Sequence, residues 1–365
     1  MAETVDNIVK TFNETNDTST ESILKKTPAT PEGMLIAYIS LVVMALVPIF
    51  LGSFRSLKLH LKNKMKKEIP ESMTEKDAMM FPIIASGALF TLFIIFRIFS
   101  KELINLLVTS YFYILGVAAL STLLRNQFSS MLPKNIPKTE FNLNFTKNSD
   151  ENKIDLINLK FTLHEVICFL SCAALGSLYL FSKHWIANNI FGLAFAINGV
   201  EMLHLNNIKI GCILLCGLFI YDIFWVFGTN VMVTVAKSFD APIKLIFPQD
   251  LLENGILGAN NFAMLGLGDI VIPGIFIALL LRFDQSLKRK TNLYFNATFL
   301  AYFLGLLTTV IIMHIFKAAQ PALLYLVPAC LITPILVALV SGDLKALFSY
   351  EDYNMELEKS SKKTK

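Results

Sequence analysis

Two aspartates lie inside stretches of sequence that are apolar enough to cross a membrane. Asp222 lies within the run 208–228, and Asp269 ends the sequence Gly266-Leu267-Gly268-Asp269 within the run 256–281. A carboxylate is costly inside a bilayer and marks a functional site, and each aspartate is the best available partner for the other. Two carboxylates that share a site of low dielectric constant cannot easily both ionise, so they hold one proton between them.

A pair of this kind can hydrolyse an amide bond. One carboxylate acts as a general base for a water molecule, and the other acts as a general acid for the carbonyl oxygen or the leaving amine. This is the chemistry of aspartyl proteases. The sequence does not tell which aspartate starts protonated, because such a pair titrates as a unit.

The spacing of the two aspartates within their runs favours this pairing. Asp222 lies 14 residues after Ile208, which is about 21 Å along a helix. Asp269 lies 12 residues before Leu281, or about 18 Å. If the two runs are adjacent antiparallel helices, both carboxylates lie at a similar depth.

The composition predicts an all-α polytopic membrane protein. The 365 residues are 54% hydrophobic and only 16% charged, whereas a soluble domain is about half apolar and about a quarter charged. Nine apolar runs are expected to form transmembrane helices, because a helix satisfies its own backbone hydrogen bonds. The runs are 34–53, 80–98, 103–124, 161–182, 185–205, 208–228, 256–281, 293–316 and 321–341. The net charge of +4 lies in loops and argues for orientation in a membrane rather than for nucleic-acid binding.

The distribution of charge predicts the orientation. Lys and Arg are concentrated in the loops after the first, third and seventh runs, which places these loops in the cytosol, the N-terminus in the lumen and the C-terminus in the cytosol. Asn13 and Asn16 begin glycosylation sequons in the predicted lumenal tail. Lys362 and Lys363 resemble the dilysine signal that returns membrane proteins to the endoplasmic reticulum. We therefore predict a multi-pass protein of that membrane.

The chain is expected to have four parts. They are a flexible lumenal tail (1–31), an N-terminal transmembrane bundle (32–182) with a cytosolic loop (125–160), a catalytic transmembrane core (183–348) and a cytosolic C-terminal tail (349–365).

Several other polar or special residues have ordinary structural interpretations. The asparagines of run 185–205 are expected to bond to other helices. Gly266 and Gly268 let a substrate strand approach the backbone, or equally let helices pack closely. Pro321 is normal at a helix start. The five cysteines lie in apolar runs and the five histidines have no metal spacing, so no metal or other cofactor is expected.

Three segments resemble a known family. Tyr221-Asp222, Gly266-Leu267-Gly268-Asp269 and Pro321-Ala322-Leu323 match the signatures of the presenilin-type intramembrane aspartyl proteases. The surrounding sequence narrows the resemblance to the signal peptide peptidase family. The segments that carry it are Lys183–Asn189, Phe219–Pro248 and Gln320–Pro328.

The resemblance implies a presenilin-like fold and an aspartic endopeptidase of the endoplasmic reticulum. It implies cleavage of signal peptides left after signal peptidase action and of some type II membrane segments. Homo-oligomers and a link to membrane-protein degradation machinery are also implied. Asp222 and Asp269 would be the catalytic pair. The residues that would shape the active site are Tyr221, Gly266, Leu267, Gly268, Pro321, Ala322 and Leu323.

Cleavage inside a transmembrane helix requires local unwinding, and the unwound strand needs backbone partners in a dry setting. We expect it to add as a β-strand either to Pro321–Leu323 or to the stretch 229–255. The β-branched residues Val231, Val233 and Val235 favour the second site.

Two other functions are compatible with intramembrane acids. A proton-coupled transporter would predict inverted repeats, and the sequence has no internal repeat. A scaffold that holds membrane clients for degradation would need no catalysis. A related protease of a later compartment is a third alternative, against which the dilysine end argues.

Overall fold

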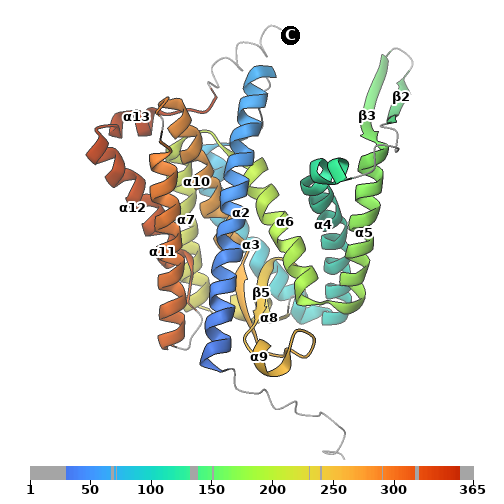
Figure 1. Ribbon diagram of the computed structural model, residues 1–365, viewed down its shortest axis with the longest axis horizontal. Coiled ribbons are helices and arrows are strands. Elements are labelled where there is room, and N and C mark those ends of the chain that lie inside the picture. Colours follow the sequence, from blue (N-terminus) through green and yellow to red (C-terminus); the bar gives the residue numbers. More distant parts are fainter. Residues whose placement is uncertain are drawn as a thin grey trace, which may run out of the picture. The chain divides into compact units, whose positions relative to one another are not determined.

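The computed structural model describes residues 30–66, 70, 72–131, 139–149, 152–229, 231–238, 241–289, 291–316 and 320–353. Among these residues, nine helices have 18 residues or more (Figure 1). They are α2 (Pro31–Lys66), α3 (Glu75–Ile98), α4 (Lys101–Met131), α5 (Leu163–Ser182), α6 (Trp185–Met202), α7 (Ile208–Phe227), α10 (Gly268–Ser286), α11 (Leu293–Phe316) and α12 (Leu323–Ser341).

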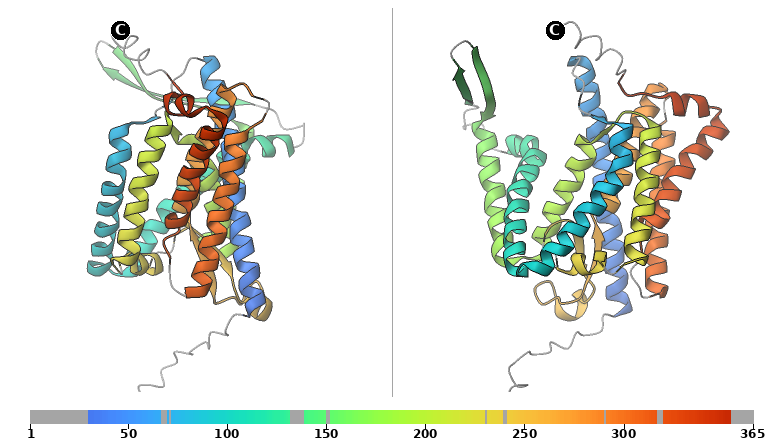
Figure 2. Two further views of the ribbon diagram at one scale, coloured as in Figure 1. Left: turned by 90° about the vertical axis from the view of Figure 1, so that its left-hand side faces the viewer. Right: turned by 180° about the vertical axis from the view of Figure 1, so that it is seen from behind.

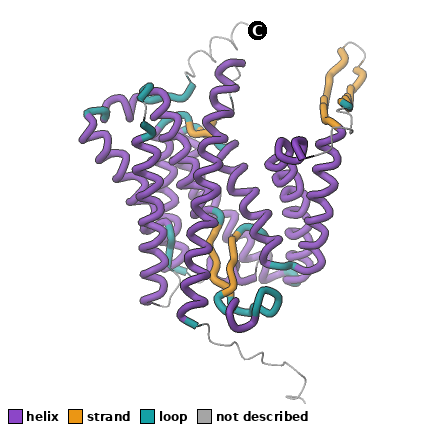
Figure 3. The backbone as a smooth tube through the Cα atoms, viewed as in Figure 1, coloured by secondary structure: helices purple, strands orange, loops and turns teal. Residues whose placement is uncertain are grey.

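The remaining elements are short. The helices are α8 (Val231–Ser238), α9 (Leu251–Asn254) and α13 (Leu344–Ser349). The strands form three two-stranded sheets, which Figure 3 distinguishes from the helices. Parallel β1 (Ser72–Met73) pairs with β4 (His204–Leu205), antiparallel β2 (Glu140–Ser149) pairs with β3 (Asn152–Thr162), and β5 (Lys244–Pro248) pairs with β6 (Phe262–Gly266).

Seven of the long helices are apolar enough to cross a membrane by length and composition. The two others are α6 and α10. In α6 the hydropathy is lowered by Asn188, Asn189, Asn198 and Glu201, whereas α10 carries three charged residues, Asp269, Arg282 and Asp284. A polytopic helical membrane protein is therefore confirmed, whereas the count of nine crossings stays a prediction.

One expectation about the region between α7 and α11 is wrong. The predicted span 256–281 begins as a helix only at Gly268, because residues 255–261 are an irregular loop and β6 follows it. Gly255, with a φ of 70°, ends α9 in a conformation that favours glycine. Val231, Val233 and Val235, which favoured the stretch 229–255 as a site of substrate pairing, lie in α8, and the strand of this stretch is β5.

Backbone contacts divide the chain into two compact units, residues 1–37 with 248–263 and residues 38–247 with 264–365. In the smaller unit, Asp250 is buried and organises the loop after α9. Its carboxylate accepts hydrogen bonds from the side chain of Asn254 and from the backbone N–H groups of Asn260 and Asn261. The predicted four-part organisation of the chain remains a prediction.

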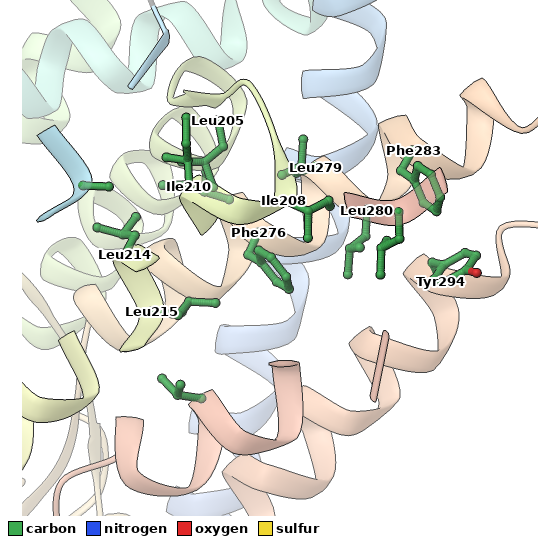
Figure 4. Close-up of a cluster of buried hydrophobic side chains, with 14 of the residues drawn as sticks. Leu205, Ile208, Ile210, Leu214, Leu215, Phe276, Leu279, Leu280, Phe283 and Tyr294 are labelled. Carbon is green, nitrogen blue, oxygen red and sulfur yellow. The ribbon is translucent and has the colours of Figure 1, made fainter. Parts of the chain in front are cut away.

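In the larger unit, α7 packs against α3, α10 and α12, and α10 also packs against α6 and α11 (Figures 1 and 2). One apolar cluster joins α7, α10 and α12 (Figure 4). Its fully buried members include Leu215 of α7 and Phe276, Leu279 and Leu280 of α10. These are the helices that carry the three sequence motifs, so the shared core fixes their relative positions.

A buried ionic cluster lies at the C-terminal end of α10, and we call it the Arg282 cluster. Arg282 donates from Nε to Asp352 Oδ2 (2.6 Å), from Nη1 to Ser56 Oγ of α2 (2.7 Å) and from Nη2 to the Leu205 carbonyl of β4 (3.3 Å). Asp352 also accepts from the hydroxyl of Tyr350. The cluster therefore ties the end of α10 to the segment after α13 and to the residues that lead into α7.

Candidate active site

Asp222 is buried in the second half of α7, with 3% of its surface exposed. The helix starts where the Asn207 side chain accepts a hydrogen bond from Ile210 N (2.9 Å), which is an N-cap. The Asp222 carboxylate accepts a hydrogen bond from the backbone N–H of Leu323 (3.1 Å). Leu323 is the first residue of α12, whose N-cap residue Ala322 offers no side-chain acceptor. Asp222 therefore caps α12 from another helix, and a negative charge there is favourable.

Asp269 lies in the first turn of α10 and is partly exposed. The turn is built on Leu267, whose carbonyl accepts from Ile270 N (3.1 Å) and Val271 N (2.8 Å). Leu267 N in turn donates to Ile243 O (3.0 Å), just before β5. The small β5–β6 sheet therefore positions the start of α10.

The two glycines of the motif differ in their surroundings. A Cβ atom at Gly266 would lie 3.3 Å from Asp269 Oδ2, which is a tight contact. A Cβ atom at Gly268 would meet only Ile272 Cδ1, at 4.0 Å. A side chain at Gly266 would therefore crowd the Asp269 carboxylate, whereas one at Gly268 would not.

The other predicted site residues lie close to the aspartates in the chain or in space. Pro321, Ala322 and Leu323 are buried at the start of α12, where Asp222 bonds. Tyr221 is half-buried and packs against the core of α7, α10 and α12. Leu267 and Gly268 line a cavity of about 570 Å³ together with residues of α3, α7, α10 and the segment 202–205.

Some predicted sites lie outside the described residues. These are the sequons at Asn13 and Asn16 and the lysines Lys362 and Lys363. Within the part of the chain that the structure describes, no three His, Cys, Asp or Glu side chains form a group that could hold a metal ion.

Three residues beside the site had no role in the sequence-based prediction of the active site. Tyr302 of α11 donates from its hydroxyl to the Asp269 carbonyl (3.1 Å). Asn188 and Asn189 bond to the backbone of β5 rather than to another helix, whereas Asn198 of the same helix bonds to Ala119 O of α4, as expected. The sequence pointed to Tyr302 only indirectly. Pro273, four residues after Asp269, has no N–H, so the Asp269 carbonyl lacks its usual helical donor and needs another one.

Comparisons with known proteins identify the family of the chain. Residues 64–354 match the family described as signal peptide peptidase. The signal peptide peptidase of Mus musculus is 59% identical over 327 residues, which cover 90% of this chain and 86% of the mouse protein. The human signal peptide peptidase gives the same identity and coverage. A probable intramembrane protease of Schizosaccharomyces pombe is 34% identical over 329 residues, covering 87% of this chain and 94% of the yeast protein.

The helical membrane fold and this similarity define an intramembrane aspartic protease. The chain belongs to the signal peptide peptidase family.

Proposed function

We propose that Asp222 and Asp269 form the catalytic dyad of this protease. The observation that carries the proposal is the hydrogen bond from Leu323 N to the Asp222 carboxylate. This bond joins the motif of α7 to the motif at the start of α12, and both helices share an apolar core with α10. The third motif opens α10, which contributes Phe276, Leu279 and Leu280 to the same core. In this dyad one carboxylate takes a proton from water as the water attacks the peptide carbonyl. The other carboxyl group gives its proton to the carbonyl oxygen, and the collapse of the intermediate returns a proton to the leaving amine.

The proposed substrates are signal peptides left in the endoplasmic reticulum membrane after signal peptidase cleavage, together with some type II transmembrane segments. The names of the mouse and human relatives support this substrate class. Water would reach Asp269 through the cavity lined by Leu267 and Gly268, which extends to Ser72 and His204 at the end of the bundle predicted to face the cytosol.

The unwound substrate would add as a β-strand to the outer edge of β6. The sheet has only β5 and β6, so the outer edge of β6 has no strand partner among the described residues. Met264 on β6 is 48% exposed, and Gly266 at its end lies beside the Asp269 carboxylate. A strand paired there would pass its backbone next to the catalytic carboxylate. The stretch 229–255 was one of the two pairing sites predicted from the sequence. Along the chain, β6 is nearer to Asp269 than that stretch is.

The remaining proposals concern location and assembly. Tyr221, Leu267, Pro321, Ala322 and Leu323 would shape the active site and contact substrate. The N-terminus would be lumenal, with glycans on Asn13 and Asn16, and Lys362 and Lys363 would retain the protein in the endoplasmic reticulum. Homo-oligomers and contact with the membrane-protein degradation machinery are part of the same proposal.

The test of the dyad uses purified protein in lipid and a transmembrane peptide with a signal-peptide sequence. Asp222→Ala and Asp269→Ala should each abolish cleavage. Asp284→Asn is the matched control, because Asp284 is a buried carboxylate of α10 that bonds to Tyr294 N and Phe295 N away from the motifs. The control should cleave the peptide. Cleavage that survives in either dyad variant would exclude the proposed pair as the catalytic residues.

The test of location uses cells. Replacing Lys362 and Lys363 by alanine should allow the N-terminal glycans to mature beyond their endoplasmic-reticulum form. Glycans that stay immature in this variant would show that another signal retains the protein, and a protein without glycans would contradict a lumenal N-terminus.

A further inference from the structure

One edge of β5 is occupied by side chains of a helix. Ile243 O accepts from Leu267 N, so the backbone groups of Ile243 and of every second residue after it point toward β6. The groups of Lys244 and Ile246 therefore point to the opposite edge. Asn188 Nδ2 donates to Lys244 O (2.8 Å), Asn189 Nδ2 donates to Ile246 O (2.6 Å), and Asn189 Oδ1 accepts from Ile246 N (2.9 Å).

The Asn189 side chain thus binds Ile246 as a neighbouring strand would, through one donor and one acceptor. Its amide replaces the backbone amide of a third strand. Pro248, the next residue of β5 on this edge, has no N–H to offer. In this way α6 occupies the outer edge of β5 at Lys244 and Ile246.

The first two turns of α6 are shaped for this contact. Trp185 packs edge-on against Phe247 of β5, with ring centroids 5.3 Å apart. Gly192 lies one turn beyond Asn188 and Asn189, and a Cβ atom there would come within 2.8 Å of Leu245 Cδ2. Both asparagines are buried, with 5% and 4% of their surfaces exposed. Buried amides of this kind are costly unless they are bonded, so the pairing with β5 is also what stabilises them in the interior.

We propose that Asn188 and Asn189 are positioning residues of the protease, which close β5 so that an unwound substrate can pair only with β6. The inference rests on the proposed function, because it assumes that substrate binds as a strand. A substrate strand on β6 lies beside Asp269, whereas one on β5 would be separated from Asp269 by the width of a strand, about 4.8 Å. Closing β5 also holds the sheet that positions the first turn of α10. The two asparagines therefore determine which peptide bond reaches the dyad.

The experiment compares two isosteric substitutions in the same helix. Asn189→Asp keeps the acceptor for Ile246 N but places an oxygen against Ile246 O, so this carbonyl loses its donor and the contact between α6 and β5 is weakened. Asn198→Asp is the matched control. Asn198 is also buried in α6, and its Nδ2 donates to Ala119 O and Ala194 O (both 2.9 Å), away from β5.

The measurements are the masses of the cleavage products, kcat and KM for the signal-sequence peptide, and hydrogen exchange of the peptide fragment that contains β5. Asn189→Asp should lower kcat roughly tenfold to a hundredfold, because misplacement by about 1 Å is that costly. It should also add products cut at neighbouring bonds and should speed hydrogen exchange in β5. Asn198→Asp should keep the wild-type cleavage positions and the wild-type exchange of β5, even if its melting temperature falls. Asn188→Ala removes one of the three bonds and serves as a milder variant if Asn189→Asp does not fold.

Two results would overturn the inference. One is a wild-type product pattern from Asn189→Asp or Asn188→Ala with faster exchange in β5. The other is the same change of cleavage positions in Asn198→Asp, which would point to general destabilisation. Failure of the proposed function is distinguishable, because wild-type protein would then cleave nothing or would cleave without Asp222 or Asp269.

Discussion

The hydroxyl group of Tyr302 donates a hydrogen bond to the backbone carbonyl of Asp269 over 3.1 Å. In a regular helix this carbonyl would accept from the N–H four residues later, but residue 273 is a proline and has none. Tyr302 is fully buried in α11 and supplies the missing donor. A side chain from a neighbouring helix therefore holds the turn that carries one of the two aspartates.

Replacing Tyr302 with phenylalanine should weaken this turn. The Asp269 carbonyl would lose its donor in the interior, which costs about 1–3 kcal/mol. We expect a lower melting temperature and a fall in kcat of roughly tenfold, with a smaller change in KM, since the substitution touches the position of Asp269 rather than the binding surface. Thermal unfolding and steady-state cleavage of the transmembrane peptide would measure both effects.

The control for this prediction is a double-mutant cycle with Pro273→Ala. Alanine restores an N–H at the position where a helix would use it, so the Asp269 carbonyl regains a donor. Tyr302→Phe should then cost less in the Pro273→Ala background, with a coupling of about 1 kcal/mol. Strictly additive effects would contradict the assigned role of Tyr302.

Asp222 should stabilise the start of α12 through its bond to Leu323 N, and this effect on stability should be separable from its proposed catalytic role. In Asp222→Asn, the side-chain oxygen can still accept from Leu323 N, so the melting temperature should stay near that of the wild type. In Asp222→Ala, the buried N–H at the start of α12 loses its acceptor, which costs about 1–3 kcal/mol. Both variants should be inactive. Equal melting temperatures for the two variants would show that the bond to Leu323 does not stabilise α12.

The sequence predicts those parts of the site that are local in the chain. Charged residues inside long apolar runs identify Asp222 and Asp269, and the three short motifs identify the family. Hydropathy also predicts the ends of α5, α7 and α11 to within a few residues, because these helices are apolar along their whole length.

Hydropathy fails where irregular backbone is also apolar. Ile256, Leu257 and Leu265 extend the predicted span, yet residues 255–261 are a loop and Leu265 lies in β6. Val231 and Val235 have β-branched side chains but lie in α8, because tertiary context overrides such propensities.

The contacts that complete the site leave no local pattern. Tyr302 and Asp269 are 33 residues apart, Asn189 and Ile246 are 57 apart, and Leu323 and Asp222 are 101 apart. Each contact depends on how whole helices pack. A single sequence gives the residue types but not their pairing.

The two glycines of the second motif should respond differently to alanine. Gly266→Ala places a methyl group 3.3 Å from Asp269 Oδ2, so the carboxylate or the strand must move. We expect kcat to fall roughly tenfold or more, because small displacements of reacting groups are costly. Gly268→Ala meets only a flexible side-chain end at 4.0 Å and should lower kcat less.

Gly87→Ala on α3 is the control for the glycine pair, because its added methyl group would have no neighbour within 4 Å. It should leave kcat unchanged. A greater loss of activity from Gly268→Ala than from Gly266→Ala would contradict the assigned contact with Asp269.

The segment after α13 should be required for stability, although it lies far along the chain from both aspartates. Arg282 and Asp352 form a buried ion pair with side chains 0% and 1% exposed, and removing one partner of such a pair costs about 3–5 kcal/mol. A chain that ends after Ser349 leaves Arg282 unpaired at the end of α10, so it should melt at a lower temperature and lose activity.

A chain that ends after Tyr353 keeps the Arg282 cluster and lacks only residues 354–365, so in purified form it should match the full-length protein in both respects. Asp352→Ala in the full-length chain should reproduce the shorter truncation, and a wild-type melting temperature for that variant would show that the ion pair does not anchor α10.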